Sequence, residues 1–164
     1  MTIAALDDLE TRARPDDHED LRLWLRLMTV HKLIGNAVRQ RLRAAFDTSL
    51  ARFDLMAQLE RNPAGIRMGE LSRRLMVTTG NITQLADQLE AEGLVVRAAD
   101  PRSRRACRIR LTAKGRKRFE AIARAHEGWI VDLFAGLSRQ DKRLLLAAFA
   151  KHKAFLAARG DGGA

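Results

Sequence analysis

The sequence predicts a mainly helical fold that contains one small two-stranded β-element, and three observations lead to this prediction. Apolar residues recur at helical spacing over most of residues 19–158. Within residues 67–111, two short helical segments are followed by two stretches whose apolar residues alternate. Long helical segments lie on both sides of this central part. With 164 residues, 46% of them hydrophobic, the chain is long enough to bury one proper core.

Two short amphipathic helices predict a helix-turn-helix in the central segment. The first carries apolar residues at Met68, Leu71 and Leu75. The second carries them at Ile82, Leu85, Ala86 and Leu89, which share one helical face. Residues 76–78 leave room for only a tight connection, and the Thr78 hydroxyl can cap the free N–H groups of the second helix.

The outward face of the second helix carries short polar side chains near its N-terminus, namely Thr78, Thr79, Asn81, Thr83 and Gln84. These side chains offer both donors and acceptors, so they can hydrogen-bond base edges in a major groove. A helix N-terminus also favours a phosphate group. Taken alone, however, the same residues fit an ordinary solvated helix face equally well.

The pattern changes to period two after Glu92-Gly93, where the glycine suits a helix end. Residues 94–96 and 106–111 predict two strands, joined by a turn over residues 100–105. From Arg97 to Arg118 there are ten lysine or arginine residues and one acid, Asp100. A two-stranded wing of this charge suits a DNA backbone and a narrow minor groove. The one-sided sign argues against a merely solvated charge run.

This central stretch resembles the MarR-type winged-helix transcriptional regulators. The matching segments are residues 70–75, 81–90, 92–95, 100–101, 104–105 and 111–115, in the family's order and at its spacing. One departure concerns the wing, because the family usually has an aspartate two residues before the arginine that Arg105 matches, whereas this chain has Ser103. The resemblance implies a winged helix-turn-helix flanked by long N- and C-terminal dimerisation helices.

The domain organisation follows from these patterns. We expect an acidic, flexible leader over residues 1–18, dimerisation helices over 19–46 and 112–158, a winged helix-turn-helix domain over 47–111 and a frayed tail over 159–164. The long flanking helices are apolar on more than one side, so each needs more than one packing partner. A chain of this size has little to cover both sides, which predicts a homodimer.

Charge and composition exclude several classes of protein. The net charge is +10, but residues 1–20 contribute −5, so residues 21–164 carry +15 and point to a polyanionic partner. No apolar run approaches the ~18 residues of a membrane span, and no signal-peptide pattern begins the sequence. One cysteine gives no intrachain disulfide framework, which fits the cytoplasm.

The sequence thus predicts a homodimeric, sequence-specific DNA-binding regulator, with repression as the family's usual mode. Its expected partner is a pseudo-palindromic duplex operator. We assign DNA contacts to Arg73, Arg74, Thr78, Thr79, Asn81, Thr83, Gln84, Arg102, Arg104 and Arg105. The alternative is a basic architectural or RNA-binding protein, although an aromatic content of 5% offers few stacking groups for single strands. No catalytic constellation is present, so we expect no enzyme and no cofactor.

The resemblance also implies a small-molecule signal. Relatives commonly bind small anionic aromatic compounds, and residues 75–83 with 126–130 resemble a subgroup that controls aromatic-acid breakdown and senses aromatic acyl-CoA thioesters. Trp24, Met28, His31 and Trp129 are candidates to line such a site, with core or interface packing as the alternative.

Neither a metal site nor a redox sensor is favoured. The four histidines lie far apart without a paired ligand motif, so no structural metal is expected. Cys107 alternates with Ile109 and Leu111, which favours a small buried strand residue over an oxidant sensor.

Overall fold

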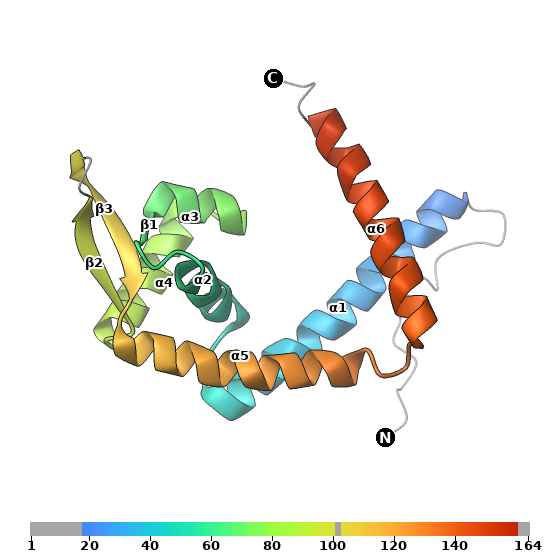
Figure 1. The fold of residues 1–164 in the computed structure, drawn as a ribbon, viewed down its shortest axis with the longest axis horizontal. Helices are drawn as coiled ribbons and strands as arrows, with labels where there is room; N and C mark the ends of the chain where they lie inside the picture. Colours follow the sequence, from blue (N-terminus) through green and yellow to red (C-terminus); the bar gives the residue numbers. More distant parts are fainter. Residues whose placement is uncertain (1–17, 101–102, 161–164) are drawn as a thin grey trace. The chain divides into compact units, whose positions relative to one another are not determined.

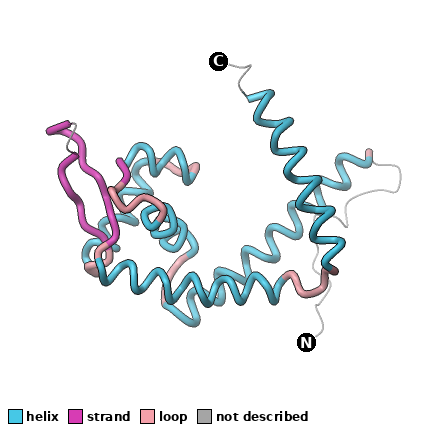
Figure 2. Tube along the Cα trace, viewed as in Figure 1, coloured by secondary structure: helices cyan, strands magenta, loops and turns pink. Residues whose placement is uncertain are grey.

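Six helices and three short strands make up the part of the chain that a computed structural model describes, residues 18–100 and 103–160 (Figures 1 and 2). For residues 100, 103–106 and 160 only the backbone is described. The predicted leader, except His18, and residues 161–164 of the predicted tail lie outside these ranges. The helices are α1 (Glu19–Phe46), α2 (Leu50–Glu60), α3 (Met68–Leu75), α4 (Thr79–Ala91), α5 (Ala113–Leu133) and α6 (Arg139–Gly160), and the strands are β1 (Ile66–Arg67), β2 (Val95–Asp100) and β3 (Ser103–Leu111). The predicted fold class is confirmed.

The chain divides between His126 and Glu127, inside α5, into two compact units. The first unit holds α1 to α4, the three strands and most of α5, and the second holds the end of α5 together with α6. α5 ends at Leu133, and α6 begins at Arg139. α6 extends to Gly160, so Arg159 is helical rather than part of a frayed tail. The functional roles assigned to residues 19–46, 47–111 and 112–158 stay a prediction.

The wing is part of a three-stranded antiparallel sheet with strand order β1-β3-β2. In this sheet Ile66 pairs with Ile109, and Val95 pairs with Leu111. The two predicted strands are confirmed, but the turn over residues 100–105 was wrong in extent. β3 already begins at Ser103, so only residues 101 and 102 separate the strands. The sequence analysis also missed β1, which is two residues long and too short to show an alternating pattern.

The core of the first unit lies where α2, α3 and α4 meet the sheet, an arrangement that Figure 1 shows from the side. The predicted inner face of α4 is buried, since Ile82, Ala86 and Leu89 are 0% exposed. Leu85 and Leu75 pack at the edge of the same cluster. Its other members are Leu55, Met56, Leu59, Ile66, Leu71, Leu94, Val95, Ile109 and Leu111.

Side chains cap the starts of α4, α2 and α6, and the cap predicted at Thr78 is among them. Thr78 accepts a hydrogen bond from the backbone N–H of Asn81 at the start of α4. At the start of α2, the Ser49 side chain is the cap, and it accepts from the N–H of Arg52. Ser138 and Asp141 form a capping box at the start of α6, in which the Asp141 N–H donates to the Ser138 hydroxyl. The Ser138 hydroxyl and backbone N–H both donate to the Asp141 carboxylate and lower its pKa.

α3 and α4 end in the same kind of turn, in which one residue takes the left-handed conformation, but that residue differs. After α4, Gly93 has φ 69° and its N–H donates to the carbonyl of Glu90, while the N–H of Leu94 donates to the carbonyl of Leu89. After α3, Met76 takes the same left-handed conformation, with φ 54°. A methionine at such a position costs roughly 1–2 kcal/mol relative to ordinary helical backbone. The turn of the helix-turn-helix is therefore mildly strained.

α5 begins directly against the end of α4. The Thr112 hydroxyl donates to the Gly93 carbonyl at 2.8 Å and accepts from the N–H of Gly115 at 3.0 Å, so it caps α5. Lys114 donates to the carbonyl of Glu92 at 2.8 Å. A Cβ placed on Gly115 would lie 1.9 Å from the carbonyl oxygen of Leu94. Only glycine lets the two backbones approach this closely.

Large apolar side chains of α1 and α6 remain exposed, as the breadth of their apolar surfaces predicts. α1 buries Val38 and Leu42 but leaves Trp24 55% exposed. On α6, Phe149 is 49% and Phe155 52% exposed. None of the described helices is both long and apolar enough to cross a membrane.

We expect Gly115→Ala to destabilise the protein, because the added methyl meets a backbone carbonyl that cannot move independently. Overpacking of this kind costs about 1–3 kcal/mol. Gly128→Ala is the matched control, since Gly128 lies in the same helix with nothing within 4 Å of its Cβ position. This control should gain about 0.5–1 kcal/mol from helix propensity. Urea unfolding of both variants at one protein concentration measures the difference, and equal midpoints would contradict the close contact.

Candidate nucleic-acid interface

α4 presents a polar outer face opposite its buried inner one. Thr79, Asn81, Thr83 and Gln84 are all exposed, along with Gly80 between them. The Thr83 hydroxyl donates to the Thr79 carbonyl at 3.0 Å, so it offers an outside partner only its acceptor lone pairs. The amides of Asn81 and Gln84 have no side-chain hydrogen bond within residues 18–100 and 103–160. These two side chains therefore keep their full donor and acceptor capacity for an outside partner.

Hydrogen bonds to Ser72 of α3 hold the corner between α3 and α4. The Ser72 hydroxyl donates to the carbonyl of Val77 at 2.6 Å and lies 3.5 Å from the Thr79 hydroxyl. Met76, at the tip of this corner, is 93% exposed. The N-terminus of α4 is thus fixed relative to α3 by polar contacts on one side and by the buried Ile82 on the other.

The two predicted arginines of α3 differ in their surroundings. Arg74 forms an ion pair with Glu70 at 2.5 Å, one helical turn away. Arg73 is exposed and carries no ion pair among the described residues. Of the two, Arg73 is the more available to a phosphate group.

The three predicted wing arginines are described only in part. Arg102 lies outside the described residues, and Arg104 and Arg105 are described by their backbone, which belongs to β3. The assignment of DNA contacts to these three arginines stays a prediction.

Arg97 of β2 joins the wing to α4, and the sequence analysis missed this role. Its guanidinium forms ion pairs with both Asp87 and Glu90 of α4, and its backbone N–H donates to Glu90 Oε1 at 3.2 Å. The hydrogen bond to Asp87 contributes most to raising the pKa of Arg97. The signal available in the sequence was the i, i+3 spacing of the two carboxylates on one helix.

Several other residues of the basic run between Arg97 and Arg118 also have local partners. Arg108 donates to the carbonyl of Gly65 at 3.0 Å and so holds the residue directly before β1. Arg116 lies 3.6 Å from Glu60, and Arg118 donates to the carbonyl of Phe46 at 2.5 Å. The run is therefore not one uniform phosphate-binding surface, because part of its charge is used to hold the domain together.

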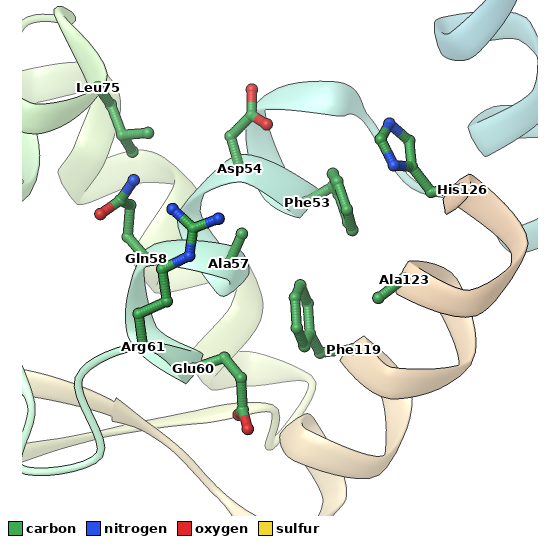
Figure 3. A pocket seen from close by; sticks show the side chains of 10 residues that line it. All are labelled: Phe53, Asp54, Ala57, Gln58, Glu60, Arg61, Leu75, Phe119, Ala123 and His126. Atoms are coloured by element: carbon green, nitrogen blue, oxygen red, sulfur yellow. The ribbon is translucent and has the colours of Figure 1, made fainter. Parts of the chain in front are cut away.

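A cavity of about 500 Å³ opens between α2 and α5, with Leu75 of α3 at its edge (Figure 3). Its walls are Phe53 and Asp54 of α2 and Phe119 and His126 of α5, among others. The predicted ligand residues Trp24, Met28, His31 and Trp129 are not among its lining residues. Trp24 and His31 are exposed, and Met28 and Trp129 are half-buried. The assignment of a ligand to those four residues stays a prediction.

No group of three or more metal-ligating side chains occurs within the described ranges. Cys107 is half-buried in β3, and its Sγ lies 3.7 Å from the Arg108 carbonyl oxygen.

Comparison with known proteins gives the family. The sequence profile of the MarR family matches residues 46–106. A crystal structure of a MarR family transcriptional regulator from Silicibacter pomeroyi is 33% identical, covers 90% of this chain and 99% of its own, and superposes with a TM-score of 0.71. The chain belongs to the MarR family.

Two further matches are an HTH-type transcriptional regulator and a solved MarR structure. The HTH-type transcriptional regulator YdgJ of Bacillus subtilis is 27% identical over 133 residues, which are 81% of this chain and 78% of the relative. A crystal structure of a mutant MarR from E. coli complexed with operator DNA is 22% identical, covers 81% of this chain and 94% of its own, and has a TM-score of 0.71. At this identity the latter likeness shows the fold.

We expect Arg97→Ala to lower the free energy of unfolding by about 1 kcal/mol, because two partly exposed ion pairs are worth roughly 0.2–1 kcal/mol each. Arg110→Ala is the control, since Arg110 lies on the neighbouring strand and is exposed. Urea unfolding at low salt measures both. In an Asp87→Asn background the Arg97 substitution should cost less, and additive effects would show that the pair is not coupled.

Proposed function

We propose that the chain is a homodimeric, sequence-specific DNA-binding transcriptional regulator that acts in the cytoplasm, with α4 as its recognition helix. The observation that carries this proposal is the division of α4 into a fully buried face and an exposed polar one. A rigidly seated helix with free amides is what direct base readout in a major groove requires. Asn81 and Gln84 are suited to adenine, whose N6 and N7 can pair with an amide side chain in a bidentate manner.

Phosphate contacts would position the helix without reading sequence. We assign them to Arg73 and, more weakly, Arg74 of α3, to Thr78 and Thr79 at the N-terminus of α4, and to Arg102, Arg104 and Arg105 of the wing. Thr83 would contribute an acceptor in the groove. Residues 21–164 carry a charge of +15, which supports electrostatic steering to a polyanion.

The exposed apolar faces of α1 and α6 support the homodimer. Trp24 and Leu27 on α1 are each at least 40% exposed, and so are Phe149 and Leu156 on α6. Exposed apolar residues of this size on each helix are unusual for a chain that works alone. The resemblance to MarR-type regulators, which implies dimerisation helices from both ends of the chain, favours the same assembly, and the solved complex of E. coli MarR with operator DNA supports a DNA partner. A two-fold dimer places two recognition helices on a pseudo-palindromic duplex.

The regulatory part of the proposal is repression that a small aromatic ligand relieves. The resemblance favours an anionic aromatic compound or an aromatic acyl-CoA, and hence a role in aromatic compound catabolism. A ligand of either kind can act only through different affinities for the DNA-binding and the released states. The cavity between α2 and α5 has the size of ordinary small-molecule sites, about 300–1,000 Å³, and its stacked phenylalanine rings suit an aromatic group.

The proposed function predicts that the protein protects a duplex with two half-sites whose centres are one or two helical turns apart. Duplexes selected from a random pool supply the operator. Scrambling one half-site should then reduce affinity by at least 100-fold at moderate salt, because each mismatched pair costs about 1–3 kcal/mol. Equal affinity for selected and random duplex would contradict sequence-specific regulation and favour an architectural or RNA-binding protein.

A second prediction separates base readout from backbone contact. Asn81→Ala or Gln84→Ala should cost about 1–3 kcal/mol on the selected operator but little on random duplex. Arg105→Ala should weaken both duplexes alike and reduce the slope of log affinity against log salt by about one. Gln88→Ala, on the same helix and one turn beyond Gln84, serves as the control. Fluorescence anisotropy over a salt series measures all four variants. An unchanged salt slope in Arg105→Ala would remove the wing from the interface.

A further inference from the structure

Gly80 is the second residue of α4, and nothing in the fold requires a glycine there. A Cβ placed on Gly80 would have no heavy atom within 4 Å. Among the described glycines only Gly65 and Gly93 have a positive φ, so the backbone of Gly80 is one that any residue can adopt. Alanine would fit this position and would favour the helix, because glycine is the poorer helix former.

The place of Gly80 on α4 gives the open space a meaning. Gly69 of α3 and Gly128 of α5 have similar space, so the space alone assigns no function. Gly80, however, lies in the polar outer face of the helix proposed to read DNA. It precedes the fully buried Ile82 by two residues, which is about 200° of helical rotation. Gly80 therefore points away from the core, toward the partner of that face.

The missing side chain leaves a gap of about one methyl group on this outer face. Thr79, Asn81, Thr83 and Gln84 are all exposed around it. Thr83 and Gln84 follow Gly80 by three and four residues, so they lie on the same side of the helix. The surface inside the gap is the Cα of Gly80 with its hydrogens, which is apolar. A group that fills the gap well is therefore small and apolar itself.

DNA offers one such group in the major groove. The base edges there carry hydrogen-bond donors and acceptors, and the C5-methyl of thymine is their apolar group. This methyl has the size of the gap, and burying it against the Cα of Gly80 would remove apolar surface from water. The neighbouring amides of Asn81 and Gln84 are suited to adenine, which brings a thymine into the same base pair.

We propose that the gap at Gly80 receives the C5-methyl group of a thymine, which makes Gly80 a specificity-determining residue of α4. This inference deepens the proposed function, on which it rests, by naming a base that is read through shape rather than through a hydrogen bond. Gln84, one turn further along the same side, reads an adjacent base pair. A side chain at position 80 would occupy the space that the thymine methyl needs.

Gly80→Ala tests this through stability and DNA binding of the full-length protein. Without DNA, the variant should unfold at no lower urea concentration than the unsubstituted protein, because the added methyl meets nothing in the fold. On the selected operator it should bind at least about tenfold more weakly, because two methyl groups compete for one gap. On random duplex its affinity and salt dependence should hardly change, since phosphate contacts remain. Gly128→Ala is the matched control and should change neither DNA affinity.

A change in the DNA supplies a second measurement. Replacing the thymidines of a half-site one at a time by deoxyuridine removes only the C5-methyl group. At one of these positions the unsubstituted protein should lose about three- to fourfold in affinity, the worth of one buried methyl group. At the same position Gly80→Ala should regain most of the affinity that it lost, because the alanine methyl then fills the vacated space. Fluorescence anisotropy measures both proteins on each duplex.

Three results would overturn the proposal while leaving the proposed function intact. A lower urea midpoint for Gly80→Ala would show that the fold itself requires the glycine. Full operator affinity in this variant would show that nothing approaches Gly80 closely. A loss of affinity that no deoxyuridine restores would place a group other than a thymine methyl in the gap. By contrast, an unsubstituted protein that prefers no duplex would contradict the proposed function, and this inference with it.

Discussion

The contact between Gly115 of α5 and the carbonyl oxygen of Leu94 is the constraint on which the rest of the first unit depends. It fixes α5 against the residues that end α4, and those residues also lead into the wing. Thr112 and Lys114 hydrogen-bond to the same short segment. One small region of backbone therefore holds the end of α4, the start of β2, the end of β3 and the start of α5. A displacement of α5 cannot leave α4 unaffected, because no flexible linker separates them.

Ion pairs between side chains also connect elements of the first unit. Arg97 ties the wing to the middle of α4, and Arg52 of α2 reaches Glu92, which follows α4, at 2.5 Å. Both sets of ion pairs therefore hold the C-terminal half of α4 to other elements. The cavity lies between α2 and α5. A change in the position of α2 would reach Glu92 through Arg52, and from there the end of α4.

The local features of the fold could be predicted from the sequence, and the non-local ones could not. Thr78, Thr112 and Ser138 cap helices because a hydroxyl needs only its own next residues to do so. The buried face of α4 follows from its apolar spacing alone. By contrast, the position of β1 depends on β3, which lies far later in the chain. The partners of Arg97 and Arg108, and the grouping of Asp54 with Phe119 and His126, likewise arise only when distant segments meet, so a single basic run or a lone aspartate gave no hint of them.

The exposure of α6 has a consequence for the amount of protein that a cell must hold. Along its described side chains, from Arg139 to Arg159, every residue except Lys142 is exposed. In proteins most of the stability of a helix comes from the packing of its apolar face against other elements. The persistence of α6 must therefore depend on how often the chain meets a partner that covers Leu144, Leu146 and Phe155. At low concentration, unpaired copies would unfold at α6 and be degraded by proteases. Degradation would then make the change from too little regulator to enough more abrupt as its concentration rises.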